Sequence, residues 1–161
     1  MTAHPDSHTI HAIIRPAQLV DADALRATCW PDRPLTSVSE LIHRTEKMAL
    51  RQRGLGVVAV YDGTPRGFGM LTVWPRAAEI SDLIVNVDCR GQGIGTQIIT
   101  YLTDAARSLK VETLEIGVAL SNPRALALYR RLEFNDQRII EIDLGLGPEP
   151  VLYLTKTLAA H

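Results

Sequence analysis

Cysteine, aromatic residues and excess charge are all scarce in this chain of 161 residues. Its two cysteines, Cys29 and Cys89, are too few for a disulfide framework or for a zinc site of their own. The formal net charge is −1 and the 17 Lys and Arg residues form no dense basic stretch, which argues against nucleic-acid binding. The chain also lacks an apolar run near the ~20 residues of a membrane-spanning helix, and its N-terminus shows no secretory signal. A cytoplasmic protein that binds neither nucleic acid nor membrane is expected.

Length and composition fit one domain that spans residues 1–161, because hydrophobic residues make up 46% of the chain and no linker interrupts it. Residues 1–10 are expected to be a flexible N-terminus. The histidines at and near this end have no carboxylate pattern beside them, so no metal site is expected. Cys89 borders the glycine-rich loop described below, but a free thiol is favoured over a nucleophile there because the sequence shows no His/Asp arrangement beside it.

Hydrophobic periodicity divides the chain into four helical segments and a larger number of β-rich runs. Helices are predicted over 21–28, from Ser37 or Ser39 to Arg53, over 93–110 and over 122–132, with Gly54 and Gly56 ending the second. A short β-like run is predicted over 13–15, and strands are predicted over 57–61, 66–74, 78–87, 111–118, 138–144 and 151–158. Asp62-Gly63 indicates a hairpin whose turn Thr64 and Pro65 lengthen beyond two residues. This order of elements implies an α/β fold with a mixed sheet covered by helices on both faces.

The most informative segment runs from Arg90 to Gly95, between a predicted strand and a long amphipathic helix. Its glycines allow tight turns and bring several N–H groups together, and the helix N-terminus behind them adds positive charge, so a phosphate or pyrophosphate site is indicated. A P-loop is excluded because no Lys-Ser/Thr pair follows the last glycine. A dinucleotide-binding fingerprint lacks its third glycine, although Glu115 lies at about the distance at which that fold has its acidic residue.

Arg90-x-x-Gly93-x-Gly95 resembles the pyrophosphate-binding motif Q/R-x-x-G-x-G/A of the GNAT superfamily of N-acetyltransferases. The resemblance implies a mostly antiparallel sheet of six to seven strands and acetyl-CoA as co-substrate, with no metal. It places the pyrophosphate on the backbone of the loop and on the first residue of the helix, and the pantetheine arm along the end of the preceding strand. The implied coenzyme-binding residues are Leu83, Ile84, Val85, Arg90, Gly91, Gln92, Gly93, Ile94, Gly95 and Thr96.

A second segment, from Asn122 through Tyr129 to Phe134, resembles the GNAT pattern N-x-x-A-x-x-x-Y-x-x-x-G-F. Asn122 followed by Pro123 is a good helix start on physical grounds alone, and the family gives this Asn a contact with the coenzyme as well. Family resemblance makes Tyr129 the general acid that protonates the leaving thiolate of CoA. Glu133 departs from the pattern, because the family has glycine where the helix ends in a left-handed conformation; strain or an altered helix cap is expected there.

Acetyl transfer to an amine needs a base, because a protonated amine has no lone pair. Glu79 is the first candidate by its resemblance to the catalytic glutamate of the histone-acetyltransferase members, and Asp82 is the second. A regular strand would put these two carboxylates on opposite faces, whereas a β-bulge between them would change that assignment. In this family the acceptor pocket is built mostly from the first two helices and their loop. The corresponding residues here, with one tryptophan on the far side, are Trp30, Asp32, Glu40, His43 and Trp74.

The function predicted from these motifs is transfer of the acetyl group from acetyl-CoA to a primary amine, by direct attack in a ternary complex. The acceptor is a small-molecule amine or a protein amino group. Two alternatives stay open: a non-catalytic acyl-CoA sensor or interaction module, which needs neither Glu79 nor Tyr129, and a dinucleotide-binding domain. A homodimer is expected from the base rate of symmetric oligomers.

Overall fold

The computed structural model describes residues 9–158; most of the predicted flexible segment 1–10 therefore lies outside the described residues. Its strands are β1 (Ile13–Pro16), β2 (Gly54–Tyr61), β3 (Thr64–Val73), β4 (Ala77–Val85), β5 (Thr113–Ala119), β6 (Asn135–Asp143) and β7 (Pro148–Thr157). Its α-helices are α1 (Ala22–Cys29), α2 (Leu35–Leu50), α3 (Ile94–Ser108) and α4 (Pro123–Arg131). None of these described helices is long and apolar enough to cross a membrane.

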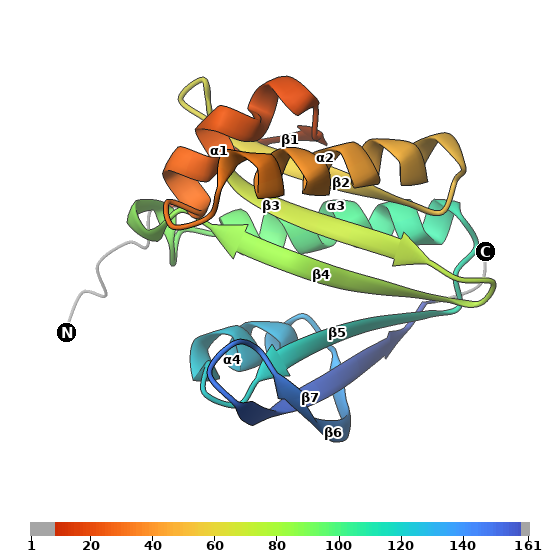
Figure 1. The fold of residues 1–161 in the computed structure, drawn as a ribbon. Helices are drawn as coiled ribbons and strands as arrows, with labels where there is room; N and C mark the ends of the chain where they lie inside the picture. The colour runs from red at the N-terminus through yellow and green to blue at the C-terminus, as the bar shows by residue number, and fades with distance from the viewer. Residues whose placement is uncertain (1–8, 159–161) are drawn as a thin grey trace, which may run out of the picture.

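The strands form one mixed sheet in the order β1-β2-β3-β4-β5-β7-β6 (Figure 1). Neighbouring strands among residues 9–158 are antiparallel except β4 and β5, which run parallel. The connection from β4 to β5 passes through α3, as a parallel pair requires. The predicted α/β class, with a mostly antiparallel sheet of up to seven strands, is confirmed.

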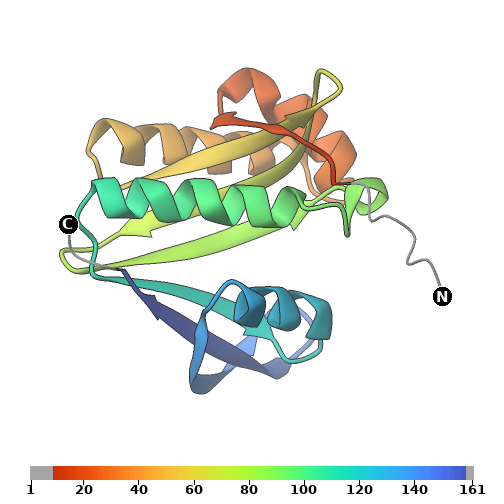
Figure 2. The same ribbon diagram turned by 180° about the vertical axis from the view of Figure 1, so that it is seen from behind.

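Helices cover both faces of the sheet, as predicted. On one face α1 and α2 pack on β3 and β2 around a core that includes Leu25, Ile42 and Phe68. On the other face α3 and α4 lie over a larger core, which includes Ile98 and Leu154 (Figure 2). Burial of these apolar side chains supplies most of the favourable free energy of folding.

Strands β4 and β5 separate part-way along their length. Their pairing runs from Ala77–Thr113 to Ile80–Ile116 and does not continue, and both views show the strands diverging beyond that point. At the same level the β3–β4 register shifts between Phe68 and Met70, so that β4 carries a bulge around Asp82. The backbone of Asp82 has φ +52°, unlike any residue of a regular strand. The sheet is therefore open at its centre.

The face that carries α1 and α2 is only partly covered. These two helices lie over β2 and β3, whereas no described helix lies over β5, β7 and β6 on that side (Figure 1). Side chains that alternate with the buried residues of β5 and β7, such as Glu115 and Tyr153, are only half-buried there. This part of the sheet is called the open face below.

Several local predictions were wrong. Helix α2 begins at Leu35 and ends at Leu50, because Pro34, rather than a serine, takes the capping position before its first turn. Gly54 and Gly56 do not end this helix but belong to β2. A Cβ on Gly56 would lie 2.7 Å from the Thr45 hydroxyl, so the glycine allows α2 to approach the strand.

The hairpin between β2 and β3 has a two-residue turn, not a longer one. Tyr61 pairs with Thr64 across Asp62 (φ +54°) and Gly63 (φ +73°), which is the backbone that suits the twist of a hairpin. Pro65 enters the strand because the β2–β3 register is irregular beside it, so that its missing N–H is tolerated. The last strand also begins earlier than predicted, at Pro148, and only residues 144–147 form the turn before it.

Candidate functional site

A cleft of about 650 Å³ opens where β4 and β5 separate, between the N-terminal turns of α3 and α4. Strand β4 forms one wall, the glycine-rich loop and the start of α3 form its end, and α4 forms the other wall. Its lining residues are Leu83, Ile84, Val85, Cys89, Arg90, Gly91, Gly93, Ile94, Gly95, Thr96, Asn122, Arg124, Ala125, Ala127, Leu128, Tyr129 and Arg131. The predicted coenzyme-binding residues line this one cleft with the exception of Gln92, whose carbonyl accepts a hydrogen bond from the Ile10 N–H.

The glycine-rich loop has the backbone that an anion site needs. Gly91 and Gly93 have φ of +73° and +89°, a conformation that other residues adopt only with strain. Gly93 occupies the capping position of α3 without a side-chain acceptor for the N–H groups of the first turn. These N–H groups and the helix dipole therefore remain available for an anionic ligand in the cleft.

Charge in the cleft has one sign. Arg90, Arg124 and Arg131 line it, and its lining residues include no carboxylate. A guanidinium nitrogen of Arg124 lies 3.3 Å from the position that a Cβ on Gly91 would take, so this side chain reaches the loop. The Arg90 Nε donates a 3.1 Å hydrogen bond to the Val85 carbonyl, which fixes its stem across the end of β4. Such a cleft favours a ligand with several negative charges.

Sequence reasoning did not single out Arg124 and Arg131 as binding residues. Both lie on α4 within or beside the second motif, and their spacing of seven residues puts them on one helix face. That spacing was the available signal. It became informative only once α4 was placed against the glycine-rich loop.

Tyr129 lies on the cleft side of α4 with only 6% of its surface exposed. Burial raises the pKa of its phenol to about 12, so the hydroxyl keeps its proton at any physiological pH. Asn122 starts this helix as predicted: its side chain accepts a 3.3 Å hydrogen bond from the Ala125 N–H, and Pro123 is the first helical residue. The cap and the phenol thus belong to one short, well-defined helix.

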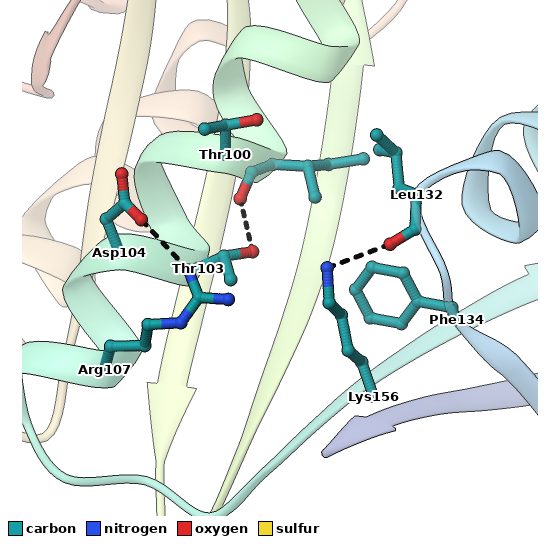
Figure 3. A pocket seen from close by; sticks show the side chains of 8 residues that line it. Thr100, Thr103, Asp104, Arg107, Leu132, Phe134 and Lys156 are labelled. Atoms are coloured by element: carbon teal, nitrogen blue, oxygen red, sulfur yellow. Dashed lines mark hydrogen bonds and ion pairs between the residues drawn. The ribbon is translucent and has the colours of Figure 1, made fainter. Parts of the chain in front are cut away.

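Two separate sets of contacts fix the C-terminal end of α4. Glu133 has φ +70°, the left-handed conformation expected at this position, and the Phe134 N–H returns to the Tyr129 carbonyl at 3.0 Å. The second contact lies in a small pocket of about 90 Å³ between α3 and β7 (Figure 3). There the Lys156 Nζ donates a hydrogen bond of 3.0 Å to the Leu132 carbonyl. Lys156 also lies 5.8 Å from the centre of the Phe134 ring. The helix that carries Tyr129 is therefore fixed at both ends.

Glu79 and Asp82 do not line the cleft. Glu79 alternates with the buried Ala78 and Ile80, which pack under α3, so its side chain lies on the open face. Partial burial, followed by repulsion from Glu115 and Asp82, raises its carboxyl pKa, while Arg138 opposes the rise. Asp82 is exposed and its strand is bulged, so the simple alternation rule does not place it opposite Glu79. The two carboxylates are close enough to repel each other.

A polar group on β5, β7 and β6 surrounds Glu79 on the open face. Glu115 is the β5 partner of Glu79 and forms an ion pair of 2.8 Å with Arg138. The Arg138 guanidinium lies 4.8 Å from the centre of the Tyr153 ring, and that ring covers Gly117. Sequence reasoning did not select Arg138, Gly117 or Tyr153, and it considered Glu115 only as a dinucleotide-binding residue.

The residues predicted for the acceptor pocket are dispersed. Trp30 packs edge-on against Phe68 at 5.5 Å between ring centres, and the Arg33 guanidinium lies 4.9 Å from the centre of its ring. The Trp30 ring is therefore already in contact with a cation, Arg33 of its own loop. The other four predicted acceptor residues, Asp32, Glu40, His43 and Trp74, are exposed side chains on the α1–α2 loop, the α2 surface and the β3–β4 turn.

The two cysteines are buried and carry free thiols, and Cys89 lines the cleft near the glycine-rich loop. Burial raises the pKa of the Cys29 thiol, which makes it a poor nucleophile. Among residues 9–158 no group of three or more His, Cys, Asp or Glu side chains is arranged to hold a metal ion.

The family model described as the acetyltransferase (GNAT) family matches residues 19–134, most of the described chain. The protein belongs to this family. The match includes β4, the glycine-rich loop, α3 and α4, so it includes every element that lines the cleft. The dinucleotide-binding alternative is therefore wrong, and Glu115, the residue that kept it open, is held by Arg138.

Sequence relatives support the same family. An uncharacterized N-acetyltransferase of Methanocaldococcus jannaschii is 33% identical over 66 residues, which are 41% of this chain and 29% of that protein. The ribosomal protein bS18-alanine N-acetyltransferase of Escherichia coli is 31% identical over 88 residues, 55% of this chain and 60% of that protein. The matched part thus spans less than two thirds of either relative.

Solved structures share the fold along nearly their whole length. The ribosomal-protein-S18-alanine N-acetyltransferase of E. coli superposes with a TM-score of 0.72 at 21% identity, over 94% of this chain and 96% of that one. A Salmonella typhimurium structure described as a putative acetyltransferase with its cofactor acetyl-CoA has a TM-score of 0.74 at 18% identity, over 94% and 96% of the two chains. At these identities the likeness concerns the fold.

Proposed function

We propose that the protein is an acetyl-CoA-dependent N-acetyltransferase that acts on a primary amine. The cleft between β4 and β5 carries this proposal, because it joins an anion site, the apolar end of β4 (Leu83 to Val85) and a buried phenol in one space. Acetyl-CoA has matching parts in the same order: phosphates, a pantetheine arm and a reactive thioester. Membership of the GNAT family supports the same donor.

The residues fit acetyl-CoA in a definite direction. The pyrophosphate would lie on the N–H groups of the Gly91–Gly95 loop, with Arg124 and Arg131 beside the phosphates. The pantetheine arm would follow Leu83 to Val85, where β4 no longer pairs with β5 and the amides of the arm would take the place of that strand. This placement brings the thioester to the start of the β4–β5 gap, near Tyr129.

Transfer would proceed by direct attack in a ternary complex. Glu79, or Asp82 as the second candidate, takes a proton from the ammonium form of the substrate, and the neutral amine nitrogen then attacks the thioester carbonyl. The C–S bond breaks as the amide forms, and the second proton that the nitrogen loses ends on the sulfur of the departing CoA. The raised pKa of Glu79 brings a carboxylate closer to the working pH and so makes it a better base. The bulge at Asp82 interrupts the pairing of β4 with β3, and a backbone N–H released there would be suited to stabilise the oxyanion.

Tyr129 would assist the leaving group. Its phenol, with a pKa of about 12, stays protonated and can donate a hydrogen bond to the thiolate sulfur. Complete proton transfer to a thiolate of ordinary pKa, ~8.5, would be uphill. The hydrogen bond, strengthened because the phenol is buried, is therefore the larger contribution.

A free amino group of a protein or of a small molecule is the proposed acceptor. The E. coli relative acts on an alanine of a ribosomal protein, and another structural neighbour is described as acting on the N-terminal serine of ribosomal protein L7/L12. These names support a protein N-terminus as the first acceptor to test, and with it a cytoplasmic location. A homodimer stays a prediction.

Thiol release from acetyl-CoA, measured with peptides that begin with Ala or Ser, a lysine-containing peptide and spermidine, tests the proposed chemistry. We expect release that depends on at least one amine, and a loss of about 100-fold in kcat for Tyr129→Phe, the lower end of the range for removal of one hydrogen-bond donor to a negative charge that develops in the transition state. Tyr61→Phe, at an exposed tyrosine of β2 that does not line the cleft, is the matched control. Tight binding of acetyl-CoA without transfer to any amine would instead favour the acyl-CoA sensor.

A further inference from the structure

The β4–β5 gap has a second tyrosine beside it, on the face opposite to Tyr129. Pairing of β4 with β5 ends at Ile80–Ile116, so Gly117 is the first residue of β5 beyond the paired segment. Tyr153 of β7 is the antiparallel partner of Gly117. Tyr129 belongs to the core under α3 and α4, whereas Tyr153 alternates with Leu152 and Leu154 of that core and therefore faces the other way.

The Tyr153 ring lies directly on Gly117. A Cβ on Gly117 would be 3.0 Å from Cε1, 3.3 Å from Cζ and 3.4 Å from Cδ1 of the ring. Three consecutive ring atoms at this distance mean that the ring leans across β5, and that it can do so only because position 117 has no side chain. The hydroxyl is one bond beyond Cζ, so it lies over β5 where the gap begins.

Neighbouring groups hold this ring in place. The Arg138 guanidinium lies 4.8 Å from the ring centre and is itself fixed by two hydrogen bonds to the Glu115 carboxylate, of 2.8 and 3.4 Å. Cations bind to aromatic faces, so Arg138 and Gly117 together determine where the ring lies. Burial and the carboxylates of Glu79 and Glu115 raise the pKa of the Tyr153 phenol, so that the hydroxyl stays protonated.

We propose that Tyr153 is a catalytic residue that contacts the acceptor: its hydroxyl accepts a hydrogen bond from the attacking amine at the β4–β5 gap. The proposal rests on the proposed function. With the coenzyme in the cleft on the α3–α4 side, the amine approaches from the open face, where Glu79 and Tyr153 lie. Glu79 takes the proton, and the Tyr153 hydroxyl holds a remaining N–H so that the nitrogen lone pair is directed at the thioester carbonyl.

The decisive variant is Tyr153→Phe, because it keeps the ring on Gly117 and under Arg138 and removes only the hydroxyl. We expect kcat/KM for the amine to fall about tenfold, as for loss of one good hydrogen bond to substrate, while the Kd of acetyl-CoA is unchanged. The acidic limb of the pH–rate profile should also remain, since Glu79 is intact. Tyr61→Phe serves as the control and should leave all three readouts unchanged.

Gly117→Ala provides an independent test, because the new methyl group displaces the Tyr153 ring without removing its hydroxyl. This variant should lose activity toward the amine by a similar factor, and adding Tyr153→Phe to it should cause little further loss. If the wild type is active and Tyr153→Phe has unchanged kinetics, the role proposed for Tyr153 is overturned while the proposed function stands. A wild type that binds acetyl-CoA but acetylates no amine of the panel would overturn the proposed function and this proposal with it.

Discussion

Two titratable side chains, Tyr129 and Glu79, stand on opposite faces of the sheet near the β4–β5 gap, and the pKa of each is raised mainly by burial. For the phenol, burial keeps the proton on the hydroxyl, which can then donate a hydrogen bond. For the carboxylate, burial and the charges of Glu115 and Asp82 make the deprotonated form a stronger base. Burial thus keeps a hydrogen-bond donor protonated on one side of the gap and raises the basicity of a carboxylate on the other.

The pH dependence of transfer should report Glu79. Its pKa lies above the ordinary value of 4.5, so kcat/KM is expected to fall as the pH drops through this raised value. Glu79→Gln should lower the rate and remove that limb of the profile. Asp82→Asn should keep the limb and move it to a lower pH, because the charge of Asp82 contributes to the raised pKa of Glu79. A limb that persists in Glu79→Gln and vanishes in Asp82→Asn would make Asp82 the base.

Loss of stability is not expected to explain a low rate in Glu79→Gln. A carboxyl whose pKa is higher in the folded state contributes stability below its unfolded pKa, and that contribution is lost as the pH rises through the folded pKa. At neutral pH the charged Glu79 thus does not stabilise the fold, and its neutral isostere should unfold at the same urea concentration or a higher one.

At the level of elements, α4 combines a regular start with a strained end. Glu133 adopts φ +70° after the last turn, where an L-residue costs about 1–2 kcal/mol and glycine does not. The surrounding bonds, from Phe134 N–H to the Tyr129 carbonyl and from Lys156 to the Leu132 carbonyl, maintain this conformation. The strain therefore lies four residues beyond the candidate general acid.

Glu133→Gly is expected to raise the free energy of unfolding by about 0.5–1 kcal/mol, since relief of the left-handed backbone outweighs the extra entropy of glycine in the unfolded chain. Urea unfolding measures the change. Glu112→Gly, at an exposed glutamate without positive φ, is the matched control and should lower the stability. Equal effects of the two substitutions would show that Glu133 is unstrained.

Elements with a strong local signal were predictable from sequence, and those that depend on partners were not. The periodicity of α3 and the cap formed by Asn122 and Pro123 are local properties, and the structure has both. The start of α2 was misplaced because a proline took the capping position where serine was expected. Gly56 was misassigned for a similar reason: its function is close packing against Thr45, which only the tertiary structure reveals.

For the molecule as a whole, the two sides of the gap differ in what sequence can reveal. The cleft is built mainly from two continuous motifs, so most of its lining was predictable. The open face joins Glu79, Glu115, Arg138 and Tyr153 from four strands, and only the strand order and register bring them together. Spacing along the chain carries no such information.

Charge is also divided between the two sides. The cleft has three arginines and no carboxylate among its lining residues, whereas Glu79 and Asp82 lie outside it. An anionic donor and a cationic amine would therefore meet surfaces of opposite charge. This division is a property of the assembled sheet rather than of either motif.

Calorimetric titration with acetyl-CoA, with NAD as the competing ligand class, tests the central claim most directly. We predict a Kd in the micromolar range for acetyl-CoA, roughly −8 kcal/mol, and no binding of NAD. Arg124→Gln should weaken acetyl-CoA binding about tenfold through loss of a charged hydrogen bond to phosphate, while Arg44→Gln, on the exposed surface of α2, should not. Absence of acetyl-CoA binding, or an affinity that Arg124→Gln leaves unchanged, would contradict the assignment of this cleft as the coenzyme site.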